Sequence, residues 1–479
     1  MSRAEDDLHA PAPSQDQLPA QTPEDLEDLA LSDDYALNPR YAKMVMEAAD
    51  RGDVVRLKEL MEALHPADVA DLMGFLTAEY REEVIPCLPP EAMPEILSEL
   101  DDNIREEVLE HMPPAALARA LGELESDDAA DLVEDLEEDK RDAVLAAMSD
   151  VDRAAIESSL AYEEESAGRL MQREVLAAPQ FWTVSQTIDH VRQTAEDLPE
   201  LFFDVYVVDP SFKPIGAVPV SQLLKAPPEA TLSSIMEAVT EIAVDMDQEE
   251  VAYIFDKYHL VSAPVTDAAG RLVGQITVDD VVGVIREESQ EDILALAGVS
   301  DAGRDAGVLE IVRSRLPWLV LNLGTETLAV TSIALFQAEI ARVVALAVLM
   351  PIVSSLGGNA GTQSLAVAVR ALASRELNAA NARRIISREL TVGLFNGLCL
   401  ALVMGAATFA FYHNIRLAIT VGLALIANVF TAALAGVLAP LILERVGRDP
   451  AVSSPIFVTF LTDFMGFFAV LALAAVILL

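Results

Sequence analysis

The chain has 479 residues, a formal net charge of −45 and a mean hydropathy of +0.32. This combination excludes an ordinary single-domain soluble protein, because one globular core does not combine so much charge with so apolar an average. From Arg315 onward there are ten Arg and seven acids, a net of +3, so the first 314 residues carry −48. An acidic water-soluble part followed by a membrane part is therefore predicted. Nucleic acid is not expected as a partner, because this charge repels it.

The first 36 residues, 1–36, are expected to form a disordered acidic tail. Their opening stretch, MSRAEDDLHAPAPSQDQLPA, has no apolar run of the kind that a secretory signal peptide contains. The two cysteines fall one in each part of the chain, so no disulfide framework is expected, which suits a reducing cytoplasm for the soluble part.

Residues 37–165 contain an internal repeat. The stretches HPADVADL, PPEAMPEIL and PPAALARAL begin at His65, Pro89 and Pro113 and recur every 24 residues. Apolar residues also recur every 12 residues, at positions 72, 84, 96, 108, 120, 132 and 144. Each 12-residue unit predicts one short helix, because Pro or Asp at its start suits a first helical turn. Stacked helices of this kind form an α-superhelix.

Most acids of this repeat are interpreted as a solvated outer face. Asp127 and Asp131 differ from the others because they are four residues apart on one face of the same predicted helix. Like charges at this spacing repel unless a cation or a basic partner lies beside them. The pair is therefore a candidate cation site.

Residues 166–288 change to short β-branched strands that alternate with helices. The stretches FFDVYVVDPSFKPIGAVPV and LVSAPVTDAAGRLVGQITVDDVV are the same α/β unit twice, and they resemble a tandem pair of CBS domains. In the second copy Gly274, Thr277 and Asp280 fit the pattern Gly-x-x-Thr-x-x-Asp, which implies a nucleotide such as ATP held through its ribose. The first copy has Pro219 and Gln222 at the last two positions. An ordinary N-capped helix start at Asp280 explains the pattern equally well.

Acids also border the second copy. On its own such a run is a solvated surface, but with −48 on the whole soluble part a cation-binding surface is plausible, because bound divalent cations relieve the repulsion. Oxygen ligands favour Mg²⁺ or Ca²⁺ over zinc. The acids in question are Asp245, Asp247, Glu249, Glu250, Asp279, Asp280, Glu287, Glu288, Glu291 and Asp292.

Residues 289–314 are expected to include a connecting helix, and residues 315–479 a membrane domain of five helices in a lipid bilayer. The apolar runs are 317–337, 343–369, 390–412, 417–443 and 453–479, each long enough to span a bilayer. Arginines gather before the first run, between the second and third, and between the fourth and fifth. The positive-inside rule then places the N-terminus and soluble part in the cytoplasm and the C-terminus outside.

The second run contains the polar stretch PIVSSLGGNAGTQS, residues 351–364. Pro351 and the glycines predict that helical hydrogen bonding is broken here, with backbone carbonyls and Asn359 facing an ion path. The alternative is tight helix packing through small residues such as Gly358 and Gly361. Thr362 and Gln363, together with Asn359, favour the path.

One carboxylate indicates the sign of the ion. Asp463 is the single acid within the last run, and an unpaired charge in a bilayer is costly. Thr459 lies one turn earlier on the same face. No basic residue lies inside the five runs, so a cation site is favoured over an ion pair. Glu326, in the first run, is the other buried acid and is interpreted as a cap of the interface.

These residues together carry a family resemblance. The pattern P-x5-GGNxGxQ from Pro351 to Gln363, the stretch DPAVSSPIFVT from Asp449 and the TD pair that ends at Asp463 resemble the MgtE family of magnesium transporters and channels. The repeat, the CBS pair, the connecting helix and five spans occur in that family in the same order. The resemblance implies a homodimer in a bacterial inner membrane, with Mg²⁺ as the transported ion and closure when cytosolic Mg²⁺ is high.

The resemblance also implies roles for single residues. Asp463 matches the pore carboxylate, Asn359 the Asn of the glycine motif, and Asp449 an acid at the cytoplasmic entrance. Residues that match Mg²⁺-sensing acids are Asp127, Asp131, Asp247, Glu249, Asp280, Glu288, Glu291 and Asp292. His259 and Gly283 stand where the family often has acids, which implies that one site between domains is lost or rebuilt.

Other functions are kept as alternatives. A membrane-anchored CBS sensor without transport explains the soluble part but gives Asp463 no role, and acids in the path disfavour a chloride channel. A transporter of Co²⁺, Mn²⁺ or Ca²⁺ would use the same ligand types. No catalytic constellation or phosphate-binding loop indicates an enzyme.

Overall fold

The computed structural model describes residues 26, 29–32, 36–194, 198–199, 201–297, 299, 308–377 and 381–478. The predicted tail 1–36 therefore lies almost wholly outside the described residues. The chain divides into an N-terminal unit, Met1–Val281, and a C-terminal unit, Val282–Leu479. Each unit is described by itself.

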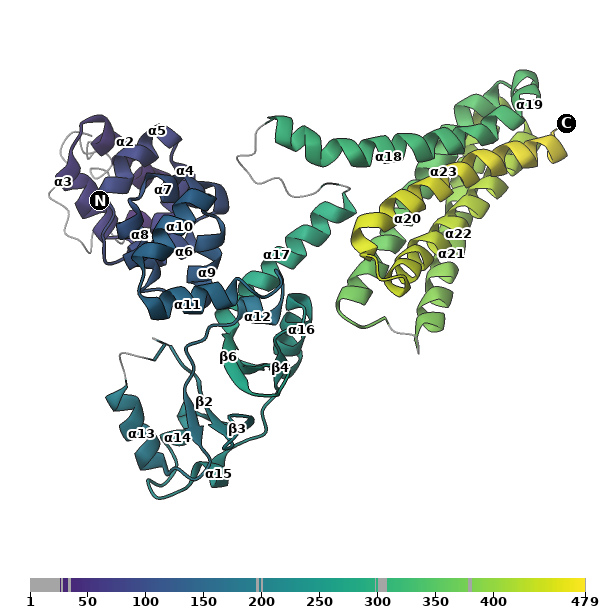
Figure 1. The fold of residues 1–479 in the computed structure, drawn as a ribbon. Coiled ribbons are helices and arrows are strands. Elements are labelled where there is room, and N and C mark those ends of the chain that lie inside the picture. Colours follow the sequence, from purple (N-terminus) through teal and green to yellow (C-terminus); the bar gives the residue numbers. More distant parts are fainter. Residues whose placement is uncertain are drawn as a thin grey trace, which may run out of the picture. The chain divides into compact units, whose positions relative to one another are not determined.

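The first part of the N-terminal unit is a stack of short helices (Figure 1). They are α2 (Pro39–Asp50), α3 (Val54–Glu62), α4 (Pro66–Phe75), α5 (Ala78–Val84), the 3₁₀ helix η1 (Ile85–Cys87), α6 (Met93–Glu99), α7 (Asp102–His111), α8 (Pro114–Leu121), α9 (Ser126–Glu134), α10 (Glu138–Ala147) and α11 (Asp150–Ser159). Proline opens several of them, as expected for a residue whose missing N–H costs nothing at that position.

The apolar residues that recur every 12 positions in the sequence form the core of this helical part. All seven positions of the apolar series are buried, from Leu72, Val84 and Ile96, each 0% exposed, to Ala120 at 6%. The helices therefore stack with one apolar anchor per repeat, which confirms the predicted superhelical arrangement of short helices.

Two three-stranded sheets follow, one for each predicted CBS copy. In the first, β1 (Ala177–Pro179) pairs parallel with β2 (Asp204–Val208), and β2 pairs antiparallel with β3 (Pro214–Pro219). In the second, β4 (Ile242–Ala243) pairs parallel with β5 (Ser262–Thr266), and β5 antiparallel with β6 (Leu272–Thr277). The helices of this region are α12 (Ala167–Leu170), α13 (Val184–Gln193), α14 (Val220–Leu223), α15 (Leu232–Ile235) and α16 (Gln248–Tyr258). The same order of strands in both sheets confirms the internal duplication.

Helix α17 (Val278–Leu296) starts directly after β6, and its later residues belong to the C-terminal unit. The connecting helix expected within 289–314 is thus the continuation of the last CBS helix. Toward its end, Ala295 is buried among Leu365, Ala451 and Val458 of the C-terminal unit. This end of α17 therefore packs against membrane helices.

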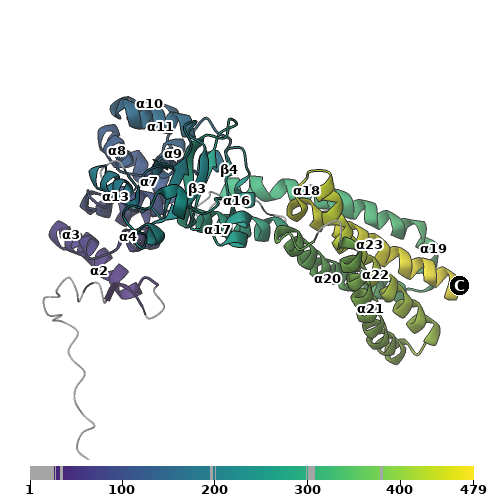
Figure 2. The same ribbon diagram turned by 90° about the horizontal axis from the view of Figure 1, so that it is seen from below.

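The C-terminal unit contains five helices that are long and apolar enough to cross a membrane, as expected. Among the described residues these helices are α18 (Val308–Leu335), α20 (Ala345–Ala373), α21 (Ala382–Tyr412), α22 (Ile415–Arg445) and α23 (Pro450–Ile477), with the short α19 (Gln337–Arg342) after α18. Figure 2, which views the chain from below, also shows α20, α22 and α23 running lengthwise beside one another. Their most buried apolar residues include Leu346, Val421 and Val470.

The predicted break in the second span is wrong. Helix α20 is continuous from Ala345 to Ala373 and passes through the whole polar stretch. Pro351 lies in its second turn, where a proline removes one hydrogen bond and leaves the rest of the helix intact. Prolines also lie inside α18, α22 and α23, which fits the tolerance of membrane helices for this residue.

The glycines of this stretch serve close helix packing, which was the alternative interpretation. A Cβ atom added to Gly361 would lie 2.6 Å from Val458 Cγ1, and one added to Gly357 would overlap the Asn428 amide. Gly358 differs, because its nearest neighbour, Thr462 Oγ1, would be 3.9 Å away. Gly357 and Gly361 therefore let α20 approach α22 and α23.

Candidate functional site

Asp463 lies in the middle of α23, half-buried among three other helices of the C-terminal unit. The Ser354 hydroxyl of α20 donates a hydrogen bond to Asp463 Oδ1. The Glu326 carboxyl of α18 lies close enough to the Asp463 carboxyl to interact with it electrostatically. Because α23 is helical throughout, Thr459 lies one turn before Asp463 on the same face, as predicted.

The polar residues of the glycine stretch divide into two groups. Gly357, Gly361 and Ser354 face the inside of the helix bundle. Asn359, in contrast, is exposed on the outer surface of α20, as are Thr362 and Gln363. Exposed amides in a membrane span are costly in lipid, so another surface or water must cover this side of α20.

A cluster of carboxyl groups lies in the N-terminal unit. Asp127, in the first turn of α9, is 6% exposed, and among the described residues its Oδ1 atom has no hydrogen-bond partner. Burial, and then the charge of Asp280, raises the pKa of Asp127 well above its usual range. Sequence reasoning named Asp127 and Asp280, and the structure brings them together.

The same cluster includes acids that the sequence did not single out. Burial raises the pKa of Glu125 to about 8, and the charges of Asp280 and Asp128 act in the same direction. Burial raises the pKa of Asp280 to about 7, although a hydrogen bond from Thr277 opposes the shift. Asp279 adds a further negative charge near these groups.

These shifts predict how stability depends on pH. A carboxyl group with a raised pKa binds a proton more tightly in the folded state, so its contribution favours folding at low pH and is lost as pH rises through the folded pKa. In chelator-containing buffer we therefore expect the thermal midpoint of the N-terminal unit to fall between about pH 5 and pH 8. Glu125→Gln should reduce this fall, because Gln is neutral at every pH and can still accept the hydrogen bond from Gln172, now 2.6 Å long.

The measurement is thermal unfolding of the full chain in detergent at several pH values, followed by the fluorescence of Trp182 with Trp318, the second tryptophan, replaced by Phe in every variant. A difference of about 1 kcal/mol would move the midpoint by roughly 2–4 °C in a unit of this size. The control is Glu123→Gln, which removes an exposed carboxylate two residues away. An equal pH slope in wild type and Glu125→Gln would contradict the assignment of the raised pKa.

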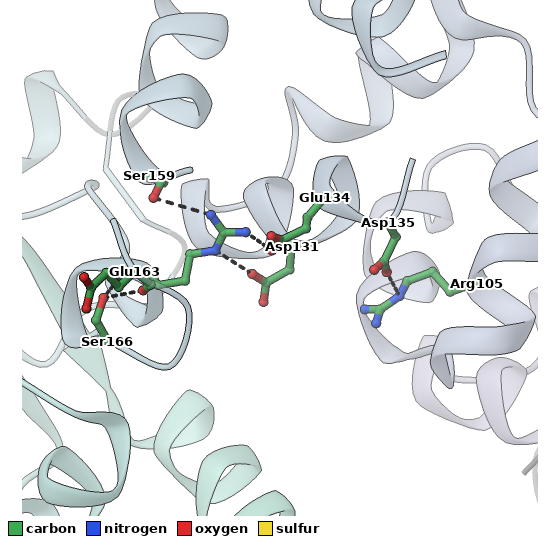
Figure 3. A network of polar contacts seen from close by, with 8 residues as sticks. Arg105, Asp131, Glu134, Asp135, Ser159, Glu163 and Ser166 are labelled. Atoms are coloured by element: carbon green, nitrogen blue, oxygen red, sulfur yellow. Dashed lines mark hydrogen bonds and ion pairs between the residues drawn. The ribbon is translucent and has the colours of Figure 1, made fainter. Parts of the chain in front are cut away.

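Asp131 has a basic partner. The Arg169 guanidinium, 7% exposed, places Nε 3.5 Å from Asp131 Oδ1 and also pairs with Glu134. Figure 3 shows Asp131 and Glu134 side by side, with Ser159 and Ser166 on the other side of the guanidinium. Of the two options left by the sequence, cation or basic partner, the structure gives Asp131 the basic partner. Nothing in the sequence of α12 alone indicated this role for Arg169.

The other predicted sensing acids of the N-terminal unit lie at the start of α16. Asp247 caps this helix, because its Oδ1 accepts a hydrogen bond from the Glu249 backbone N–H at 2.9 Å. His259 ends the same helix in the left-handed conformation, with φ of 54°.

A second group of acids lies in the C-terminal unit, where α17 meets the membrane helices. Burial raises the pKa of Asp292, and the charges of Asp449 and Glu288 act in the same direction. Asp449 is exposed and caps α23 through a 2.7 Å hydrogen bond from the Ala451 backbone N–H. The structure therefore brings three predicted acids together at one place, while Glu291 is exposed on the same helix. Gly283, earlier on α17, has open space around it.

The candidate nucleotide residues bind each other. Thr277 precedes α17, and its hydroxyl donates to Asp280 Oδ2 at 2.8 Å. The alternative interpretation placed a helix start capped by Asp280, but α17 already begins at Val278, so Asp280 is the third residue of the helix.

The acids of these clusters suit a hard divalent cation by ligand type, and the orphaned Asp127 Oδ1 is a free ligand atom. Within the described parts of the chain, no three His, Cys, Asp or Glu side chains are close enough together to hold a metal ion. Ion binding would therefore require the acids of a cluster to move toward one another.

The fold and these sites define a multi-span membrane protein with an acidic soluble part. The family model "Divalent cation transporter" matches residues 350–473, "MgtE intracellular N domain" matches residues 64–165, and "CBS domain" matches residues 232–287. The "Magnesium transporter MgtE" of Thermus thermophilus is 34% identical over 450 residues, which cover 92% of this chain and 99% of that one. That of Bacillus subtilis is 31% identical and covers 67% of this chain and 71% of its own length. The chain belongs to the MgtE family.

Among solved structures, one described as "Crystal structure of the cytosolic domain of the Mg2+ channel MgtE in complex with ATP" is 35% identical. It aligns with a TM-score of 0.48 and covers 51% of this chain and 99% of that chain. The relatives above are named as transporters, and none of the matched families is an enzyme family by its description.

Proposed function

We propose that this protein transports Mg²⁺ across the bacterial inner membrane and that it is closed by cytosolic Mg²⁺ bound among its acidic clusters. One observation carries the transport proposal: Asp463 lies in the middle of a membrane helix, where the Ser354 hydroxyl donates a hydrogen bond to it, and α23 contains no Lys or Arg. A carboxylate in such a position marks a cation pathway. Mg²⁺ is chosen among divalent cations because the relatives are named for it.

The protein acts as a homodimer in this proposal. Support comes from Asn359, Thr362 and Gln363, which are exposed on one side of α20. A second copy, with water between the two, would cover these polar groups and bring the two Asp463 side chains toward a shared path. Mg²⁺ gives up its water reluctantly, so the carboxylates would hold it largely through its hydration shell, with Thr459 below.

The distribution of arginine supports the proposed orientation, with the N-terminus in the cytoplasm and the C-terminus outside. The proposed domain boundaries remain 37–165, 166–288, 289–314 and 315–479. ATP binding at Thr277 and Asp280 also remains a prediction, and the nucleotide would have to replace the hydrogen bond between these two side chains.

Gating follows from the acidic clusters. Without divalent cations, ionisation of Asp127 beside Asp280 is unfavourable, and loss of their protons opposes close packing of α9 against the start of α17. Bound Mg²⁺ would remove this repulsion and favour the packed state. The end of α17 packs among the membrane helices through Ala295, so a change in α17 can reach the pore. Asp292, Glu288 and Asp449 form the second cluster at that end.

We expect hydrogen exchange at the backbone amides of α9 to slow as Mg²⁺ is added. In Asp127→Asn/Asp280→Asn the Mg²⁺ concentration at the midpoint should rise, by about tenfold or more, because two ligands of the same site are lost. The control Asp71→Asn/Asp142→Asn changes the net charge equally at exposed positions and should keep the wild-type midpoint. An unchanged midpoint in Asp127→Asn/Asp280→Asn would contradict the bridging role.

The transport proposal is tested with purified protein in liposomes that contain a Mg²⁺-sensitive dye. External Mg²⁺ should enter in a saturable way. Dye signals equal to those of empty liposomes, with folded protein present, would instead support a membrane-anchored CBS sensor.

A further inference from the structure

The segment that leads from the helical repeat into the CBS pair is bound to the second CBS copy through its backbone. The Gly168 N–H donates to the Val244 carbonyl, directly after β4, at 2.8 Å. A Cβ atom added to Gly168 would lie 2.9 Å from this carbonyl oxygen, so the close approach requires glycine. Gln172 and Gln275 of β6 exchange two backbone hydrogen bonds, each 2.9 Å long. The backbone on both sides of Arg169 is therefore fixed to the second CBS copy.

The Arg169 side chain extends from this segment to the helical repeat. Its guanidinium forms an ion pair with Glu134, and its Nε lies 3.5 Å from Asp131 Oδ1. Both acids belong to the second half of α9. Arg169 Nη1 also donates to the carbonyl of Ser159, the last residue of α11, at 3.5 Å. One side chain thus joins two helices of the repeat to the second CBS copy.

Burial makes this contact necessary for Arg169 but not for the two acids. Arg169 is 7% exposed, whereas the side chains of Asp131 and Glu134 are 61% and 43% exposed. A guanidinium that is removed from water is costly unless anions pair with it. The two carboxylates, in contrast, can be hydrated when α9 moves away. The packing of α9 on this segment therefore includes the positive charge of Arg169 as a fixed part.

The first turn of α9 meets the same segment among acids. The Ser126 hydroxyl donates to Glu174 Oε2 at 2.9 Å, and the Arg173 backbone N–H donates to Ser126 Oγ at 2.8 Å. The next residue in the chain is Asp127, the buried acid of the proposed Mg²⁺ cluster. The two halves of α9 thus contact one segment in different ways, through a group of acids at the first turn and through acids paired with a guanidinium in the second half.

We propose that Arg169 is a positioning residue that acts as a built-in cation. Its contact with Asp131, Glu134 and Ser159, here called the Arg169 clamp, holds the second half of α9 against the second CBS copy when Mg²⁺ is low. Mg²⁺ is then left to act at the first turn of α9, where Asp127 lies. The link to gating rests on the proposed function, whereas the clamp itself is a property of the soluble part without Mg²⁺.

The test measures hydrogen exchange of the full chain in detergent, in buffer that contains a chelator. The reporter is the Arg173 backbone N–H, because its hydrogen bond to Ser126 Oγ exists only while α9 is packed on the segment. Arg169→Met keeps an unbranched side chain but removes the charge. We expect the Arg173 amide to exchange about tenfold faster in this variant, because bonds to charged groups are lost.

Mg²⁺ distinguishes a built-in cation from a side chain that only fills space. In Arg169→Met the carboxylates of Asp131 and Glu134 are free to bind a metal ion. Saturating Mg²⁺ should therefore bring the exchange of the Arg173 amide to within about twofold of wild type at the same Mg²⁺ concentration. A packing defect would instead leave the variant about tenfold faster than wild type at every Mg²⁺ concentration.

The acids of the clamp are tested in a second variant. Asp131→Asn/Glu134→Gln leaves the buried Arg169 without an anion, so the Arg173 amide should again exchange about tenfold faster in chelator. Mg²⁺ should not remove this difference from wild type, because two ligands are gone. The matched control is Arg153→Met, which removes an α11 arginine whose side chain is 37% exposed and pairs within its own helix. It should exchange as wild type does.

Three results would overturn the proposal. They are wild-type exchange of Arg169→Met in chelator, a difference in Arg169→Met that saturating Mg²⁺ does not reduce, and wild-type exchange of Asp131→Asn/Glu134→Gln in chelator. If Arg169→Met does not fold, Asp131→Asn/Glu134→Gln decides alone. Faster exchange that persists in Mg²⁺ then supports the clamp, and any other result refutes it.

Failure of the clamp is distinguishable from failure of Mg²⁺ gating. If Mg²⁺ slows exchange at the Arg173 amide in wild type while Arg169→Met equals wild type in chelator, gating by Mg²⁺ stands and the clamp is refuted. If Mg²⁺ has no effect on wild type while both clamp variants exchange faster in chelator, the clamp stands and the proposed gating fails.

Discussion

Asp463→Asn is expected to reduce Mg²⁺ uptake to the level of empty liposomes. Asn keeps the size of the side chain and can still bond to Ser354, but it lacks the charge that makes a bilayer position favourable for a cation. The measurement is dye-reported Mg²⁺ influx at saturating external Mg²⁺. Size-exclusion chromatography and the thermal midpoint would show that the variant is folded.

A suitable control is Glu376→Gln, which removes one negative charge from an exposed position between α20 and α21. It should transport as wild type does, because surface charge outside the path is screened by salt. Asp463→Asn with wild-type flux would remove this residue from the mechanism.

Gly361→Leu is expected to stop transport and to destabilise the membrane unit by about 1–3 kcal/mol, the usual range for overpacking. Even the first added carbon would lie 2.6 Å from Val458 Cγ1 and 3.4 Å from Thr462 Cγ2, so α20 and α23 would have to separate. Separation of these helices would also pull Ser354 away from Asp463. The measurement combines Mg²⁺ influx with the thermal midpoint of the purified protein.

Gly358→Ala is the matched control for this variant. Its added carbon would be 3.9 Å from Thr462 Oγ1, an ordinary contact, so flux and stability should remain near wild type. From sequence, Gly358 was expected to be as important as Gly361, and the structure ranks them differently. Loss of function in Gly358→Ala with normal function in Gly361→Leu would contradict the packing geometry.

The sequence predicted those parts of the fold whose signal lies within a short stretch of the chain. The 12-residue series from Leu72 to Val144 indicated one helix per repeat because each helix contributes one apolar anchor to the core. The two CBS copies and the five apolar runs are equally local signals, and each corresponds to elements of the structure. Pattern alone was enough here because burial and periodicity have the same cause.

The second span shows where local reasoning fails. Proline and glycine in a short stretch predicted a broken helix, since both weaken helices in water. In this bundle the glycines instead allow α22 and α23 to approach, and the helix persists. Whether a glycine breaks or packs a helix depends on its neighbours in space, which a single sequence does not reveal.

Only part of each candidate site was predictable from the sequence, because the sequence does not show which distant residues become neighbours in space. Asp127, Asp280 and Asp463 were identifiable because acids in a buried pattern or an apolar run are conspicuous. Arg169 beside Asp131 and Glu326 beside Asp463 were not, because each contact joins residues far apart in the chain. A lone Arg in a short helix, or a lone Glu in a span, carries no signal of its partner.

The central claim, that this chain moves Mg²⁺ through its membrane helices under the control of its soluble acids, is tested most directly by one flux measurement. Purified wild-type protein in liposomes is given external Mg²⁺ while Mg²⁺ on the side of the soluble part is set at low or high concentration. The account predicts saturable influx at low Mg²⁺ on that side and a marked slowing at high Mg²⁺. Influx no greater than in protein-free liposomes at either concentration would contradict it.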